Sequence, residues 1–134
     1  MSSQPFRDIS HNLLRVMAGL LFMQHGAQKL FGWLDGRQVS DIASVSGVAG
    51  ILEFFGGALI VLGLFTRPVA FILSGEMAVA YFWRHMPGGF WPILNRGELA
   101  ALYCFIFLFF AAHGPGTWSL DALLRRRKHG ADAA

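Results

Sequence analysis

The sequence predicts an all-α integral membrane protein, a four-helix bundle followed by a short C-terminal interfacial helix. Two observations predict this fold class. Hydrophobic residues make up 54% of the 134-residue chain and charged residues only 14%, whereas a soluble domain carries about 25% charged residues. The hydrophobic residues also stand in long blocks instead of alternating with polar ones, which favours lipid as the surrounding solvent. A single domain, residues 1–134, accounts for the whole length.

Four apolar stretches define the expected transmembrane spans, and they cover about residues 13–33, 45–65, 68–83 and 98–112. The first has a short apolar core and continues through polar residues to Trp33. The second and third each contain one charge, Glu53 and Glu76. The third begins at Pro68, a residue that favours the first turn of a helix. The fourth is short for a span, at about 22 Å of helix.

The segments between and after these stretches are polar or rich in glycine and proline. Residues 1–10 are expected to be frayed, and residues 34–44 and 84–97 to be loops. The aromatic content of the second loop is typical of the headgroup zone. A last helix is expected at 119–127, capped by Ser119. Its leucines share one face and a basic block follows them, a pattern typical of a helix on the membrane surface.

Orientation follows from lysine and arginine, which are enriched on the cytoplasmic side of membrane proteins. With four spans, both ends of the chain lie on the same side. That side holds most of the eleven basic residues, namely Arg7, Arg15, Arg67, Arg125, Arg126, Arg127 and Lys128, against Lys29, Arg37, Arg84 and Arg96 on the other. Both termini are therefore predicted to be cytoplasmic, and the two longer loops to face outward.

Ionisable side chains lie inside three of the expected spans. His25 and Glu53 each stand eight residues from the outer end of their span, and Glu76 stands eight residues before Arg84, which directly follows its span. Each distance is about 12 Å along a helix. Lys29 lies one turn above His25 on the same helix face. Each charge costs about 2.5–3.5 kcal/mol inside a membrane, so these four side chains are expected to face one another within the bundle. Lys29 is the expected cation for Glu53, because a short loop joins their spans.

The residues alone leave two interpretations of this cluster open. In one, the charges neutralise each other and only hold the bundle together. In the other, they line a polar pocket that opens to the outer face. Gly47, Gly50 and Gly57 share a stripe with Glu53, and small residues let a neighbouring helix or subunit approach closely.

Haem ligation by two histidines would have to use His25 and His85.

Composition also bears on other function classes. The basic block Arg125–Lys128 has no other basic surface beside it, so it indicates topology or attraction to anionic lipid heads, and no nucleic acid partner is expected. Cys104 is the one cysteine, so the chain alone forms neither an internal disulfide nor a CxxC pair. No metal-ligand set is expected, and the N-terminus does not have the pattern of a cleaved signal peptide.

Several motifs resemble those of the DoxX family of bacterial membrane proteins. They are GLLFMQHGAQKLFGW at 19–33, GVAGILEFFGGALIVLGLFTRP at 47–68, FILSGEMAVAYFW at 71–83, GFWPILNRGELAALYCF at 89–105 and GPGTWSLD at 114–121. The resemblance covers about residues 11–124. It implies a four-helix protein of the bacterial inner membrane. The family is named for its similarity to a subunit of a thiosulfate:quinone oxidoreductase, and some members are linked to thiol redox and oxidative-stress complexes.

The resemblance and the charge cluster together favour a redox-associated membrane subunit, linked to quinone or to thiol and sulfur metabolism. We expect it to bind a quinone, held non-covalently, or another small ligand in the outer half of the bundle. Glu53, Glu76 and His25 are the candidate catalytic residues, with the carboxyls exchanging protons. The candidate ligand-binding residues are Gln24, Gln28, Lys29, Trp91, Asn95 and Glu98.

Such a subunit would act as part of an oxidoreductase only with a partner, because the chain has no thiol pair, flavin motif or metal set of its own. A redox partner subunit or a homo-oligomer is therefore expected in the lipid bilayer. Two alternatives use the same chain differently: a transporter of a small molecule or lipid, or a structural scaffold subunit of a membrane complex.

Overall fold

A computed structural model describes residues 3–134, and every regular element in this part of the chain is helical. The α-helices are α1 (Gln4–Phe31), α2 (Val45–Ile51), α3 (Gly57–Leu62), α4 (Thr66–Ala80), α5 (Pro92–Asn95), α6 (Glu98–His113) and α7 (Leu120–Asp132). Two π-helical segments, η1 (Leu52–Gly56) and η2 (Tyr81–His85), and a 3-10 turn, η3 (Met86–Gly88), complete them. The expected all-α class is confirmed.

Helix α1 is longer than the sequence predicted. Residues 1–10 were expected to be frayed, yet α1 begins at Gln4, and only residues 1–2 lie outside the described part of the chain. Pro5 in the first turn explains this start, since its fixed φ suits a helix and its missing N–H is not needed there. The helix ends at Gly32, which adopts the left-handed conformation with its N–H bonded to Gln28 O.

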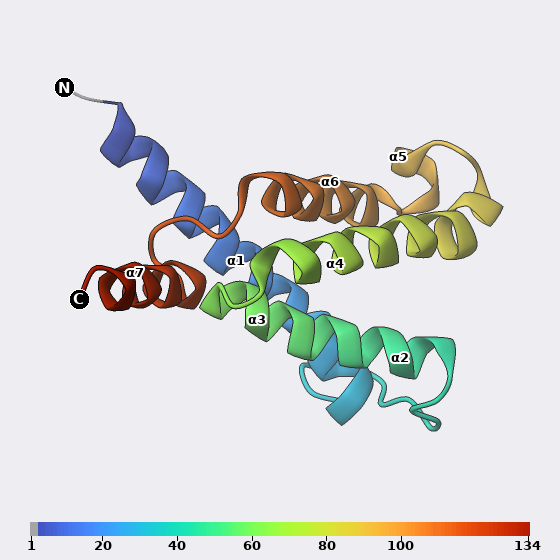
Figure 1. Cartoon of the computed structure of the whole chain (residues 1–134). Helices are drawn as coiled ribbons and strands as arrows, with labels where there is room; N and C mark the ends of the chain where they lie inside the picture. Colours follow the sequence, from blue (N-terminus) through green and yellow to red (C-terminus); the bar gives the residue numbers. More distant parts are fainter. Residues whose placement is uncertain (1–2) are drawn as a thin grey trace.

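The second helix, α2–η1–α3, runs without a break over Val45–Leu62 and packs along α1 (Figure 1). The packing is close because glycines lie at the crossing. A Cβ on Gly26 would lie 2.3 Å from the backbone N of Phe54, and a Cβ on Gly57 would lie 2.9 Å from Gly19 O. Of the glycine stripe expected around Glu53, Gly50 and Gly57 therefore contact α1 of the same chain, whereas Gly47 contacts Ile42 in the loop before α2.

Helices α4 and α6 form a second closely packed pair (Figure 1). Their interface holds most of the buried core, including Leu73, Tyr103 and Phe107. Phe22 of α1 reaches this core, with its ring centroid 5.2 Å from that of Tyr103 and 4.8 Å from that of Phe107. The fold is thus two helix pairs joined through one aromatic cluster.

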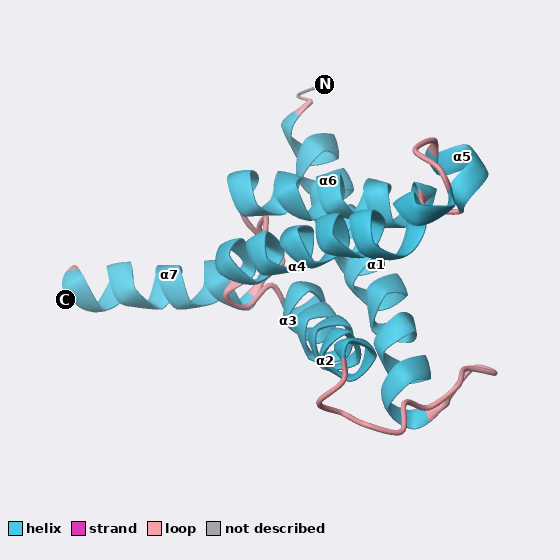
Figure 2. Cartoon of the chain, turned by 90° about the vertical axis from the view of Figure 1, so that its right-hand side faces the viewer, coloured by secondary structure: helices cyan, strands magenta, loops and turns pink. Residues whose placement is uncertain are grey.

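The connections differ in part from expectation. Residues 84–97 were predicted to be a loop, but they contain the end of η2, the turn η3 and the short helix α5. The C-terminal helix was expected at 119–127 and extends to Asp132, while the predicted cap is confirmed, since Ser119 Oγ accepts from Ala122 N at 3.1 Å. Figure 2 shows α7 leaving the other helices and running out to the side.

A buried arginine ties three segments together at the end where α7 begins. Arg15 is 1% exposed, and its guanidinium donates to Ile60 O at 3.0 Å, to Trp118 O at 2.5 Å and to Pro115 O. Asn12 supports it, accepting from Arg15 and from Trp118 N. We call this group the Arg15 clasp. It joins α1, the end of α3 and the linker before α7.

Two further contacts fix the same end of the molecule. Asp121 of α7 accepts from Phe65 N and Thr66 N, both at 2.9 Å, and so caps the N-terminus of α4. Arg67 donates to Ala112 O at 2.5 Å near the C-terminus of α6. Every helix that reaches this end is therefore held by side chains that satisfy backbone groups.

Exposed large apolar side chains occur on every α-helix of the described chain. Within residues 3–134, one helix, Val45–Leu62, is both long and apolar enough to cross a membrane by length and composition alone, and Glu98–His113 is apolar but shorter. Helix α1 is less apolar than the predicted first span required, because it carries Arg15, Lys29 and several polar residues. The predicted third span is divided between α4 and η2.

Candidate functional site

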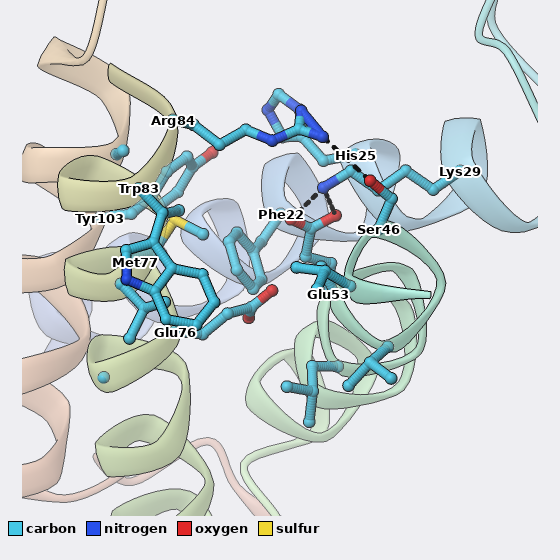
Figure 3. Close-up of a pocket in the computed structure, with 18 of the residues that line it drawn as sticks. Phe22, His25, Lys29, Ser46, Glu53, Glu76, Met77, Trp83, Arg84 and Tyr103 are labelled. Carbon is cyan, nitrogen blue, oxygen red and sulfur yellow. Dashed lines mark hydrogen bonds and ion pairs between the residues drawn. The ribbon is translucent and has the colours of Figure 1, made fainter. Parts of the chain in front are cut away.

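A cavity of about 740 Å³ lies between the two helix pairs, at the end opposite the Arg15 clasp (Figure 3). Volumes of this size are typical of sites for small organic ligands. Its lining comes from α1, α2 with η1, α4 with η2, and α6. The lining includes Phe22, His25, Lys29, Ser46, Glu53, Gly75, Glu76, Trp83, Arg84 and Tyr103.

The predicted ion pair between Lys29 and Glu53 is confirmed. Lys29 Nζ lies 2.6 Å from Oε1 and 2.7 Å from Oε2 of Glu53, so the ammonium donates to both oxygens. The Glu53 side chain is 4% exposed and that of Lys29 is 31% exposed. The pair is therefore anchored at the carboxylate, with the lysine reaching it from the cavity side.

Glu76 enters the same cavity from α4 and has no partner. Both of its carboxyl oxygens are buried, and neither has a hydrogen-bond donor among the described residues. Figure 3 shows its side chain directed towards the side of the cavity where Phe22 and Glu53 lie. A buried carboxyl group without a donor is expensive, so this position favours a ligand that supplies one.

Basic groups lie around the rest of the polar wall. His25 lies one turn before Lys29 on α1, with its ring 6.4 Å from that of Tyr103. Arg84 of η2 donates to Ser46 Oγ at 3.0 Å, which links the second helix pair to the start of α2. Lys29–Glu53 is the one salt bridge within the described residues. Arg84 and Arg96 at the cavity therefore have no carboxylate partner there.

The structure brings His25, Lys29, Glu53 and Glu76 to one cavity, whereas the other candidate residues lie outside its lining. Gln24, Trp91 and Glu98 are exposed. The Gln28 side chain donates to Leu34 O at 3.1 Å and supports the loop after α1. Asn95 donates to Gly89 O at 2.7 Å and accepts from Gly97 N at 2.8 Å, which organises the turn before α6.

Both π-helical segments line the cavity, and neither was predicted from the residue pattern. Glu53 lies in η1, and Trp83 and Arg84 lie in η2. A π segment inserts one extra residue into a helical turn and often occurs at functional sites. Ser46, Arg84 and Tyr103 also line the cavity and were not predicted to do so. Arg84 counted in the sequence only as a topology signal.

The arrangement suits a small molecule with two kinds of polar contact. Lys29 and Arg84 offer donors on one side, and Glu76 offers acceptors on the other. The remaining wall is largely apolar. Within residues 3–134, no group of three or more His, Cys, Asp and Glu side chains is placed to hold a metal ion. The cavity can thus orient a polar head by hydrogen bonds and surround the rest of a ligand with hydrocarbon.

Known proteins support a family assignment. The sequence model of the DoxX family matches residues 11–86, more than half of the chain. The chain is 43% identical over 124 residues to an uncharacterized protein of Haemophilus influenzae, covering 88% of this chain and 92% of that protein. It is 29% identical over 133 residues to an uncharacterized membrane protein of Mycobacterium tuberculosis, covering 85% and 80%.

A further relative is the inner membrane protein YqjF of Escherichia coli, which is 28% identical over 126 residues, covering 90% of this chain and 95% of that protein. No solved structure matches the chain at a significant level. The family match covers most of α1 and the helices from α2 to η2, and the alignments to the relatives cover 85–90% of the chain. The chain therefore belongs to the DoxX family of membrane proteins.

Proposed function

We propose that this protein spans the bacterial inner membrane four times with both termini in the cytoplasm. The spans are α1, α2–η1–α3, α4–η2 and α6, and α7 lies on the membrane surface. Exposed apolar side chains on all of these elements support this proposal, since a water-soluble protein rarely exposes so large an apolar surface. The name of the Escherichia coli relative supports the inner membrane.

Within this bundle the protein is a ligand-binding subunit of a redox system. Its ligand is a small lipid-soluble carrier of the quinone class, held non-covalently in the cavity at the outer half of the bundle. One observation carries the proposal: the two buried carboxyl oxygens of Glu76 lack a donor, and they share a cavity with the donors Lys29 and Arg84. A quinol has hydroxyl groups that both donate and accept, and it fits this arrangement.

In this proposal Glu76 accepts a hydrogen bond from one hydroxyl of the quinol, and it is the candidate acceptor for that proton. Lys29 and Arg84 donate to the opposite oxygen, and His25 beside them is the candidate acceptor for the second proton that a quinol releases on oxidation. Cys104 is the single cysteine of the chain, so the chain alone has no thiol pair that could exchange electrons with the ligand. The two electrons of the quinol therefore pass to a partner subunit or to an oxidised cofactor that the partner binds. A redox partner or a second copy of the chain is thus part of the proposed complex.

Binding of a short-chain benzoquinol to the purified protein in lipid nanodiscs tests the proposal. Trp83 lines the cavity, so its fluorescence is expected to be quenched on binding, and Trp83→Phe identifies that part of the signal. Glu76→Gln should weaken binding by about tenfold, because the amide replaces one acceptor oxygen with an N–H donor, and an unsatisfied buried polar group costs about 1–3 kcal/mol.

Glu98→Gln is the matched control, because Glu98 makes the same chemical change at an exposed position outside the cavity. Its affinity should stay within about twofold of wild type, as expected for a surface substitution. Equal affinity of Glu76→Gln and wild type would show that Glu76 does not touch the ligand. A stable protein partner recovered with no benzoquinol binding by wild type would favour the scaffold alternative.

A further inference from the structure

The side of the cavity that faces away from the core is entirely apolar. On the first helix pair it is formed by Val48, and on the second by Ile72, Gly75 and Val79. Val48, Ile72 and Val79 are 48%, 54% and 45% exposed. Side chains that line a cavity and are also this exposed lie at its opening. The cavity is therefore open between α2–η1 and α4 on the surface that would face lipid.

Gly75 marks the middle of this opening. A Cβ built on Gly75 would meet no atom within 4 Å, in contrast to Gly26, Gly56 and Gly57, whose Cβ atoms would touch the neighbouring helix. Glycine at position 75 therefore serves no close helix contact. It leaves the surface of α4 bare beside Glu76, the next residue along the helix.

The end of the cavity towards the loops is different. There Arg84 of η2 donates to Ser46 of α2 at 3.0 Å and joins the two helix pairs. Arg96 and His85 also line this end, so a route from water passes several cationic and hydrogen-bonding groups. The polar groups thus lie at one end of the cavity, and the apolar opening lies at its side.

We propose that the ligand enters this cavity sideways from the bilayer and that it is a membrane-dissolved amphipath. Its polar head lies between Glu76 and Lys29, and its apolar chain leaves between α2–η1 and α4, over Gly75, into the lipid. The inference rests on the proposed function, because it takes the cavity as the ligand site. It adds the class of ligand, one with a long apolar chain, and the path by which the ligand arrives.

Two probes distinguish binding of the polar head from binding of the apolar chain. One is a benzoquinol without a chain, and the other is the same benzoquinol with a decyl chain. Gly75→Leu puts a branched side chain into the opening. It should weaken binding of the decyl probe by about tenfold or more, because the branched side chain occupies the space that the chain must pass through. Binding of the chain-free probe should change by less than about twofold.

Gly75→Ala is the matched control, because its methyl group enters open space and leaves the opening free. It should bind both probes as wild type does. Both probes partition into the same nanodiscs in every variant, so comparison between variants removes the partition effect.

Three results would overturn the inference. If Gly75→Leu binds the decyl probe as wild type does, the chain does not pass over Gly75. If it loses both probes equally, the substitution disturbs the whole cavity and not a lateral path. If it changes the oligomeric state and leaves decyl binding intact, a second copy covers the opening. Failure of wild type to bind either probe would instead refute the proposed function on which the inference rests.

Discussion

Replacing either member of the Lys29–Glu53 pair should destabilise the protein, and the two replacements should not cost the same. The pair is short, at 2.6 and 2.7 Å, but its members differ in burial, with 31% of the lysine side chain and 4% of the glutamate side chain exposed. Lys29→Met leaves a buried carboxylate without its cation. Glu53→Gln leaves a lysine that can extend towards water at the cavity end.

The magnitudes follow from these exposures. Removing one partner of a fully buried ion pair costs about 3–5 kcal/mol, while an exposed pair contributes about 0–1 kcal/mol. We therefore expect Lys29→Met to lower the free energy of unfolding by about 3 kcal/mol, because Glu53 cannot reach water. Glu53→Gln should cost about 1 kcal/mol. The double variant should cost less than the sum, since it strands no charge.

Reversible unfolding in mixed micelles measures these values, and the double-mutant cycle gives the coupling free energy. Lys128→Met and Glu98→Gln repeat the two chemical changes at exposed positions and should each stay within about 0.5 kcal/mol of wild type. A larger cost for Glu53→Gln than for Lys29→Met would refute the reasoning from burial. Additive costs would show that the two side chains do not interact in the membrane.

Three further outcomes are expected from the rest of the molecule. Arg15→Lys should lower the free energy of unfolding by about 2–4 kcal/mol, because one ammonium cannot donate to all the separate carbonyls of the clasp. Arg125→Lys, at an exposed position, is the control. Gly26→Val should separate α1 from η1 and lower the melting temperature, whereas Gly130→Val, in open space, should not. Reporters inserted before α2 and before α6 should read outside, with a C-terminal reporter inside; a C-terminal reporter outside would reverse the topology.

The charge cluster could be found from the sequence because depth along a helix can be counted. His25, Glu53 and Glu76 stand at nearly equal distances from the ends of their apolar stretches, and all three line one cavity. The partner of Glu53 was also accessible, because consecutive antiparallel helices are neighbours and Lys29 faces the second one. The depth of a residue along its helix and the adjacency of consecutive helices can both be counted from the sequence.

The amide side chains predicted to bind a ligand lie outside the cavity lining, and the reason is physical. Gln28 and Asn95 resemble ligand-binding residues by position, yet each bonds to backbone groups a few residues away. Loops leave carbonyl and N–H groups without partners, and nearby amides satisfy them. Such local bonds depend on how the chain turns, which the side-chain pattern does not record. The Arg15 clasp was missed for the same reason, since most of its partners are backbone carbonyls.

The two ends of the molecule are held with very different strength, and this decides where the cavity can form. At the clasp end, a buried guanidinium, the Asp121 cap and the Arg67 contact join α1, α3, α4, α6 and α7. At the other end, among the described residues, the Arg84–Ser46 hydrogen bond alone joins the two pairs through polar side chains. An exposed bond of this kind contributes about 1 kcal/mol, whereas opening the clasp would strand a buried charge. The helix pairs can therefore separate at the cavity end while the clasp acts as the fixed end, and such a movement would widen the proposed lateral opening without disturbing the rest of the fold.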